Sequence, residues 1–227
     1  LHVRSRRQRQ MCIRDRLLKD GLVTSNGKKI RSSGAHVDPE KDEIYVGDEK
    51  INYSKYVYYM LNKPDGYVSA TEDNVYPTVI DLIKEYHPGL FPVGRLDVDT
   101  EGLLLITNDG QLAHRLLSPR THVPKTYYVK VKGRLGIGDV NAFTKGIPLE
   151  DFTCMPSYLN IIKSDEVSEC EVTIYEGKFH QVKRMFQACG KEVVYLKRIS
   201  MGELKLDENL KLGHYRPLTD EEINSIL

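Results

Sequence analysis

A continuous apolar run, Leu103-Leu104-Leu105-Ile106, most constrains how this chain folds. In a strand, successive side chains point to opposite faces, so a run of this kind predicts a strand covered on both faces. The run follows Gly94–Gly102, a segment that holds one arginine and three carboxylates between two glycines. Charged groups beside a buried strand are costly unless they have partners. The segment is therefore a candidate functional site at the start of a core strand.

The charges of this segment allow several interpretations from the residues alone. A solvated loop would account for the composition. A calcium-binding loop would not, because Asn108 stands where a bidentate carboxylate is needed and the flanks predict strands. The spacing leaves open a glycosidase carboxylate pair. It also leaves open a metal-dependent hydrolase that uses Asp97, Asp99 and Glu101.

The overall composition sets limits on class and compartment. The chain has 227 residues, with 33 Lys and Arg against 32 Asp and Glu, so RNA affinity would require a local basic patch. The cysteines are scattered without a Cys-x-x-Cys pair, which is typical of reduced thiols in a cytoplasmic protein. No apolar run is long enough to cross a bilayer, and no signal peptide is evident. We therefore expect a cytoplasmic protein without a membrane partner.

The first sixteen residues differ from the rest. They contain six arginines and one aspartate, a net charge of +5, which leaves −4 for the remainder of a chain whose total is +1. A basic arm that binds RNA is one interpretation. We favour another, in which residues 1–16 are foreign to the fold or disordered.

Three motifs resemble one family. Gly94 to Gly110 reads Gly-Arg-Leu-Asp-x-x-Thr-x-Gly-Leu-Leu-Leu-x-Thr-x-Asp-Gly, and it resembles the signature of the ribosomal RNA pseudouridine synthases. Residues 62–66, Asn-Lys-Pro-Asp-Gly, and residues 177–186 resemble two further motifs of that family. The whole resemblance covers residues 17–227 and is closest to the branch that acts on small-subunit rRNA. It implies an α+β fold, a mostly antiparallel mixed sheet with flanking helices, as the catalytic domain over residues 56–227. Residues 17–51 resemble a truncated S4-type RNA-binding module.

The resemblance also implies an activity. It is the site-specific isomerisation of a uridine in rRNA to pseudouridine, with uridine 516 of 16S rRNA as the expected position. The substrate would be 16S rRNA or a small-subunit assembly intermediate, and the enzyme would be a monomer. The uracil stays in the site throughout, so no cofactor and no metal are expected. A large-subunit (23S) rRNA pseudouridine synthase is the near alternative.

The motifs assign roles to particular residues. Asp97 matches the family's catalytic aspartate, and Tyr127 matches a tyrosine that lies against the target base. Tyr127 also shares a strand face with Val129, so it is equally well interpreted as a core residue. Lys183 matches the basic residue that reaches the aspartate. Arg184, about 100° further round the same predicted helix, is expected at an RNA phosphate.

A wider set of side chains is expected to bind RNA. Arg95 is placed to fill the gap that the extruded uridine leaves, although a salt bridge with Asp99 or Glu101 is an alternative role. The other candidates come from the three motifs and from the strand that carries Tyr127. The full set is Arg95, Lys63, Lys125, Lys178, His180, Gln181 and Arg184.

Overall fold

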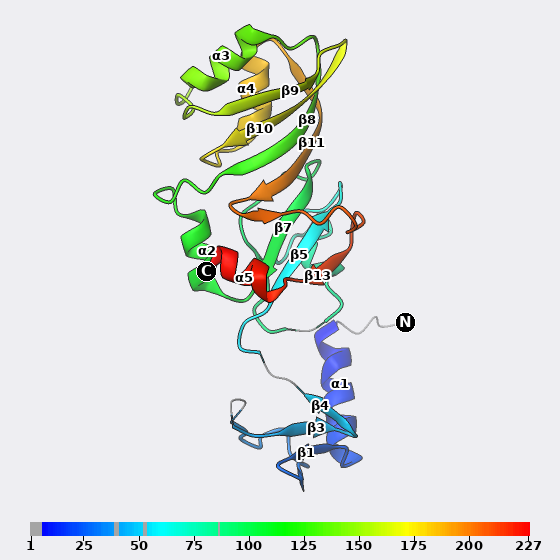
Figure 1. The fold of residues 1–227 in the computed structure, drawn as a ribbon. Helices are drawn as coiled ribbons and strands as arrows, with labels where there is room; N and C mark the ends of the chain where they lie inside the picture. The colour runs from blue at the N-terminus through cyan, green and yellow to red at the C-terminus, as the bar shows by residue number, and fades with distance from the viewer. Residues whose placement is uncertain (1–5, 39–40, 52–53, 86) are drawn as a thin grey trace. The chain divides into compact units, whose positions relative to one another are not determined.

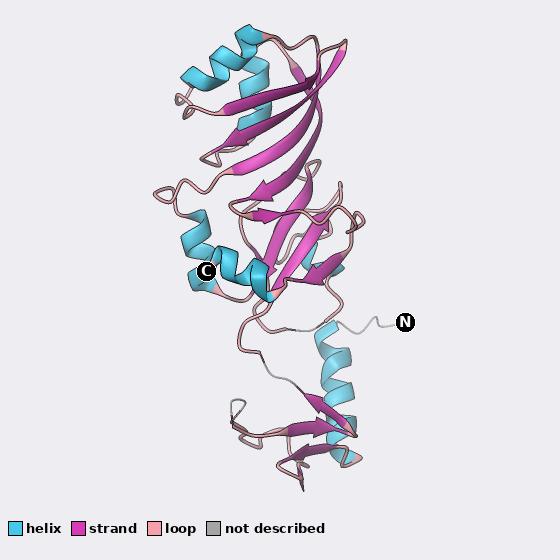
Figure 2. Cartoon of the chain, in the orientation of Figure 1, coloured by secondary structure: helices cyan, strands magenta, loops and turns pink. Residues whose placement is uncertain are grey.

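The computed structural model of the chain describes residues 6–38, 41–51, 54–85 and 87–227. It divides the chain between Lys55 and Tyr56 into two compact units, each described by itself below (Figure 1). Figure 2 shows that both units combine helices with strands. The elements are α1 (Arg6–Lys19), β1 (Val23–Ser25), β2 (Lys28–Lys29), β3 (Ile44–Val46), β4 (Glu49–Ile51), β5 (Tyr58–Lys63), η1 (Val79–Leu82), β6 (Phe91–Pro92), β7 (Glu101–Thr107), α2 (Gly110–Leu117), β8 (Lys125–Lys132), α3 (Ile137–Lys145), β9 (Tyr158–Lys163), β10 (Val167–Ile174), α4 (Gln181–Ala188), β11 (Glu192–Met201), β12 (Leu204–Lys205), β13 (Tyr215–Pro217) and α5 (Asp220–Ile226).

The first unit is one helix and a small antiparallel sheet of strand order β2-β1-β3-β4. Helix α1 ends just before Gly21, whose φ of 64° is the left-handed conformation expected of a glycine that stops a helix. Asn26 and Gly27, both with positive φ, form the turn between β1 and β2, as their sequence predicts.

Residues 1–16 were expected to be foreign to the fold or disordered. In the structure residues 6–16 belong to α1, while residues 1–5 lie outside the described residues. Ile13 is 56% exposed, whereas Leu18, near the end of the helix, is buried. The foreign origin of residues 1–16 stays a prediction.

The second unit is organised around a mixed sheet of strand order β13-β5-β7-β11-β8-β10-β9, in which β6 and β12 add to β7 and β11. Every pairing in it is antiparallel except that of β7 with β11. Helices α3 and α4 lie beside the β8 to β10 part of the sheet, and α2 and α5 lie beside the other end (Figure 1). The predicted α+β class, with a mostly antiparallel mixed sheet and flanking helices, is confirmed.

Strand β7 is covered on both faces, as its apolar run predicts. Leu104 and Ile106 belong to one hydrophobic cluster, which includes Phe186 of α4. Leu103 and Leu105 belong to a second cluster on the opposite face, with side chains from α2 and α5. All four residues of the run have no exposed surface. The loop before β7 is therefore fixed at one end by the most buried strand of the unit.

Gly102 is a point of close approach between β7 and β11. Its φ is +100°, and a Cβ atom built there would lie 2.2 Å from the carbonyl oxygen of Arg198. The two nearest atoms, the carbonyl oxygen and the amide nitrogen of Arg198, are backbone and cannot rotate away as a side chain can. The parallel pairing Gly102–Arg198 therefore requires glycine.

We expect Gly102→Ala to lower the free energy of unfolding by about 3 kcal/mol or more, because it combines a disfavoured φ with a backbone clash. Gly110→Ala is the matched control. It begins α2 and nothing lies within 4 Å of its built Cβ, so alanine there should be neutral or slightly stabilising. Urea unfolding of the two variants measures the difference. Equal stabilities would contradict the close approach.

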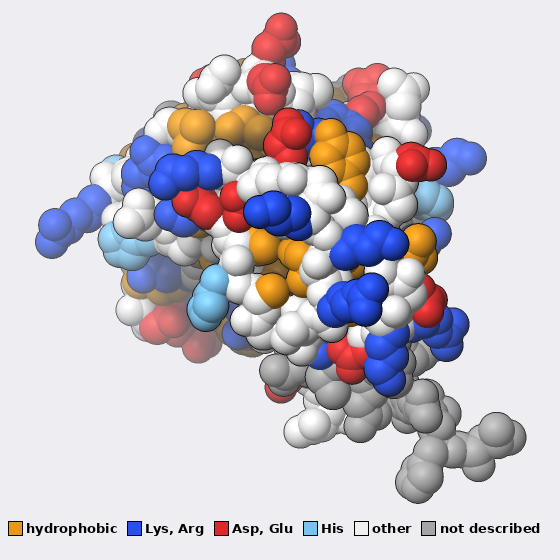
Figure 3. Space-filling model, turned by 90° about the horizontal axis from the view of Figure 1, so that it is seen from below, with side chains coloured by type: hydrophobic (Ala, Val, Ile, Leu, Met, Phe, Trp, Pro, Cys, Tyr) orange, Lys and Arg blue, Asp and Glu red, His pale blue; other side chains and the backbone are white. Residues whose placement is uncertain are grey.

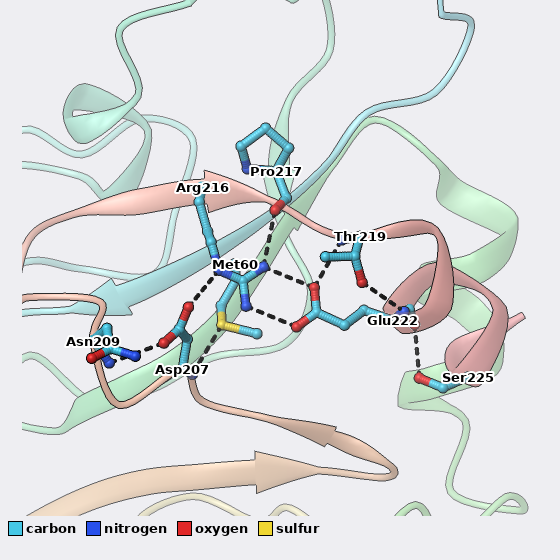
Figure 4. Close-up of polar contacts among 8 residues, drawn as sticks. All are labelled: Met60, Asp207, Asn209, Arg216, Pro217, Thr219, Glu222 and Ser225. Atoms are coloured by element: carbon cyan, nitrogen blue, oxygen red, sulfur yellow. Dashed lines mark hydrogen bonds and ion pairs between the residues drawn. The ribbon is translucent and has the colours of Figure 1, made fainter.

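The C-terminal segment is fixed to the sheet by a polar cluster (Figure 4). The guanidinium of Arg216 donates to both carboxylate oxygens of Glu222, at 2.8 Å each, and to Asp207 at 2.8 Å. Glu222 also accepts from the backbone of Thr219, whose hydroxyl accepts from Glu222 N. This is the capping box that the sequence predicts at the start of α5.

Two surface properties bear on function. On the face drawn in Figure 3, Lys and Arg side chains are interspersed with Asp and Glu. Within the described ranges, no helix has the length and apolar character needed to cross a membrane.

Candidate active site

Asp97 lies in the loop that leads into β7, and backbone contacts fix the loop on both sides of it. Its carbonyl accepts from Thr100 N at 3.1 Å, and the carbonyl of Val98 accepts from Gly66 N at 3.0 Å. Leu96, just before Asp97, exchanges two hydrogen bonds of 3.0 Å with the buried hydroxyl of Ser69. The Asp97 side chain is 28% exposed, so its carboxylate has a fixed position with access to solvent. Ser69 was not among the predicted site residues, because no motif marks it.

Lys183, near the start of α4, reaches this carboxylate. Its Nζ lies 3.3 Å from Oδ2 of Asp97 and donates a hydrogen bond of 2.6 Å to Oδ1 of Asp99. The sequence predicted Lys183 rather than Arg184 at Asp97, and the structure has Lys183 there. The shorter contact to Asp99 was not predicted. One ammonium group thus holds two carboxylates of the same loop.

The charges of this group act on one another. Burial opposes the charge of Lys183, but the hydrogen bond to Asp99 and the charges of both aspartates outweigh it and raise the pKa of Lys183. Burial also acts against the charge of Asp99, yet the hydrogen bond from Lys183 holds the pKa of Asp99 below its usual value. Lys183 is therefore a permanent cation at neutral pH.

His180 approaches the other carboxylate oxygen of Asp97. Its Nε2 lies 3.5 Å from Oδ1 of Asp97, and its ring stacks on Phe179 with ring centroids 3.8 Å apart. The sequence placed His180 among the RNA-binding residues without a contact to the aspartate. The structure brings it, together with Lys183, to the carboxylate.

Lys63 is buried in the structure, so it lacks the exposed surface that its predicted RNA contact requires. It has no exposed surface, and its Nζ donates to three backbone carbonyls, those of Pro64, Val98 and Thr100, at 2.8–3.0 Å. Burial lowers its pKa to about 8, an effect that the surrounding carboxylates oppose. In β5, Lys63 shares a strand face with Tyr59 and Leu61, which both belong to the core cluster. That shared face was the signal that could have shown its burial.

We expect Lys63→Met to lower the free energy of unfolding by about 1–3 kcal/mol, because three buried carbonyls would lose their donor. Replacement of an RNA-contacting lysine on the surface would change the free energy of unfolding by less than about 0.5 kcal/mol. Lys178→Met, at an exposed position, is the control. Thermal or urea unfolding without RNA measures both variants. A Lys63→Met protein as stable as the control would restore the surface assignment.

Two more of the predicted RNA contacts are occupied within the protein. Gln181 is 4% exposed, donates to Glu176 at 2.8 Å and accepts from Lys178 N at 2.9 Å, so it braces a turn and has little surface for an RNA contact. Arg184 forms an ion pair with Asp151, and its guanidinium lies over the ring of Phe152. Its expected contact with phosphate would have to replace or share this pair.

The remaining two lysines differ from each other. Lys125 donates to Val123 O at 2.8 Å, and burial lowers its pKa, so its ammonium already has an acceptor. Lys178 is exposed, with its Nζ 5.6 Å from the centroid of Phe152. Of these two, only Lys178 is presented to solvent as an RNA contact requires.

Arg95 and Tyr127 have opposite surroundings. Arg95 is exposed and has no ion-pair partner among the residues that the structure describes, and the alternative salt bridges are not formed. Asp99 pairs with Lys183 instead, while Glu101 accepts from the hydroxyl of Tyr195. Tyr127 is 7% exposed and belongs to the large hydrophobic cluster. In strand register it lies beside Arg198, which pairs with Gly102 of β7.

The ligand geometry bears on the hydrolase alternative. Asp97, Asp99 and Glu101 do not converge, since Glu101 points to Tyr195 and Asp99 to Lys183. Over the ranges that the structure covers, no three His, Cys, Asp or Glu side chains are grouped as metal ligands. What the site holds is one carboxylate between a lysine and a histidine.

The sequence profile described as RNA pseudouridylate synthase matches residues 57–188, which include this loop and α4. The chain belongs to the RNA pseudouridylate synthase family. It is 47% identical over 212 residues to an uncharacterized RNA pseudouridine synthase, YtzG, of Bacillus subtilis, covering 92% of this chain and 89% of that protein. It is 42% identical over 219 residues to ribosomal small subunit pseudouridine synthase A of Escherichia coli, covering 95% and 93%.

A solved pseudouridine synthase shares the fold. The structure described as a pseudouridylate synthase has a TM-score of 0.70 and 39% identity, and covers 95% of this chain and 93% of its own. This pseudouridine synthase is therefore an isomerase that converts uridine in RNA to pseudouridine. The match extends over both compact units.

Proposed function

We propose that this enzyme modifies 16S rRNA, at uridine 516, with Asp97 as the catalytic carboxylate. The observation that carries the assignment of Asp97 is its position between Lys183 and His180 in a loop fixed by buried contacts. The 42% identity to the small-subunit enzyme, over nearly the whole of both chains, supports the choice of rRNA. The protein acts in the cytoplasm as a monomer, on 16S rRNA or an assembling small subunit, and the S4-like first unit adds RNA contacts.

The reaction breaks the bond between C1′ and N1, turns the uracil and joins C1′ to C5. The proton on C5 is lost and N1 gains one, so the product is an isomer of the substrate. Asp97 acts first, either as a nucleophile at C1′ or as a base at C2′. Lys183 orients the carboxylate through its ion pair. Tyr127 supplies a buried aromatic edge for the uracil, and Arg95 takes the place of the extruded base.

Mapping pseudouridine in rRNA tests this proposal. Purified enzyme is incubated with separate transcripts of 16S and 23S rRNA, and the modified positions are mapped by chemical derivatisation and reverse transcription. The expected result is modification at uridine 516 of 16S rRNA, unaffected by a metal chelator. Modification confined to 23S rRNA would identify the large-subunit alternative. Chelator-sensitive strand cleavage would indicate the hydrolase.

A further inference from the structure

Phe179 is the most exposed large aromatic side chain that the structure describes, with 75% of its surface exposed. Single apolar residues on a surface need no explanation. Phe179 differs because it is part of a chain of contacts that begins at Asp97. His180 lies 3.5 Å from the carboxylate, and Phe179 stacks on His180 with an interplanar angle of 18°. One face of the phenyl ring is covered by the imidazole.

The turn that carries the two rings is fixed. His180 has φ of 48° and ψ of 30°, a left-handed conformation uncommon outside glycine. Its carbonyl accepts from Arg184 N at 2.9 Å, and the buried Gln181 side chain accepts from Lys178 N on the other side of the turn. The backbone that carries the two rings is therefore set before any ligand binds. Such preorganisation reduces the entropy cost of binding.

The surroundings favour a nucleotide over a protein segment as the occupant. Lys178, next to Phe179 in the chain, is exposed and has no ion-pair partner in the described ranges. An exposed aromatic face beside an exposed cation is the combination that binds single-stranded nucleic acid. A single ring is too small for a stable protein interface, which buries many residues on each side.

We propose that Phe179 and His180 form a stacking site for a nucleobase adjacent to the target uridine. The proposal rests on the proposed function, which places the target ribose at Asp97. The imidazole contacts Asp97, and Phe179 lies one ring further away, so the base on the open face of Phe179 is a neighbour of the target. Holding this unstacked neighbour helps to keep the target uridine out of its own stack. The site thus contributes to the choice of sequence context.

Fluorescence and binding measurements test the site without turnover. The probe is a short 16S rRNA fragment containing uridine 516, with 2-aminopurine placed in turn at each flanking position. Stacking on Phe179 should change the emission at one position with wild type and with Phe179→Trp, and not with Phe179→Leu or Phe179→Ala. We expect Phe179→Ala to weaken binding of the fragment by about 5-fold to 100-fold. Because the Phe179 ring is exposed, the melting temperature of the Phe179→Ala protein should match that of wild type.

An abasic residue at the same RNA position provides the second arm. This abasic RNA should bind wild type more weakly than the intact fragment does, by the same factor as the Phe179→Ala substitution. The Phe179→Ala protein should bind the abasic and the intact fragments with equal affinity. Tyr158→Ala is the matched control, an exposed aromatic on edge strand β9. The stacking site would be overturned if the affinity losses from the abasic residue and from Phe179→Ala were additive at every flanking position. Wild-type RNA affinity in Phe179→Ala would overturn it as well. If the losses are non-additive but no pseudouridine forms, the proposed function fails and the stacking site stands.

Discussion

Asp97→Asn is expected to abolish pseudouridine formation while RNA binding persists. The amide keeps the shape of the carboxylate, and the contacts that fix the loop use the backbone of Asp97 and its neighbours. The side chain can neither attack the sugar nor take up a proton. Loss of a catalytic carboxylate or nucleophile lowers turnover by about 10⁴-fold or more. Release of tritium from RNA labelled at C5 of uridine, under single-turnover conditions, measures the change.

Asp99→Asn is the matched control for this variant. Asp99 belongs to the same loop and binds the same lysine, but its side chain is 66% exposed against 28% for Asp97. We expect Asp99→Asn to keep turnover within about tenfold of wild type, since it loses only a partly exposed ion pair. Turnover by Asp97→Asn above about a hundredth of wild type would rule out Asp97 as the catalytic group.

The sequence predicted the parts of the fold that depend on local pattern. The apolar run of β7, the Asn26-Gly27 turn and the capping box of α5 each follow from residues close together in the chain. The position of Lys183 at Asp97 followed from a motif match and from helical spacing. Such features can be predicted without knowing which other segments of the chain pack against them.

The exposure of individual polar residues could not be predicted in the same way. Lys63 and Gln181 were expected at RNA because each stands in one of the family motifs. Their burial depends on segments distant in sequence or on a turn, namely the Val98–Thr100 backbone over Lys63 and the Glu176–Lys178 turn around Gln181. The parallel pairing of β7 with β11 joins residues almost a hundred positions apart, and only its glycine was visible in the sequence.

Lys183→Met is expected to lower kcat by about 10²-fold to 10³-fold at saturating RNA. Asp97 and Asp99 both lie within ion-pair distance of the one Nζ atom. Without that ammonium, two like charges face each other in a partly buried loop, and the orientation of Asp97 is lost. Removing one preorganised electrostatic partner from an active site typically costs this much. Because the loss concerns the reacting carboxylate, we expect it in kcat rather than in KM.

Two further variants separate this role from general attraction of RNA. Arg184→Met removes the adjacent cation, which pairs with Asp151 instead of Asp97, and should lower kcat by less than about tenfold. Asp99→Asn, added to Lys183→Met, removes the competing charge and should restore part of the activity, a coupling that a double-mutant cycle measures. The ammonium of Lys183 would contribute only to RNA binding if the kcat of Lys183→Met stayed within tenfold of wild type. The same conclusion would follow if Arg184→Met lowered kcat as much as Lys183→Met does. Partial recovery of kcat when Asp99→Asn is added to Lys183→Met would instead show that Lys183 acts through the charge of the loop that presents Asp97.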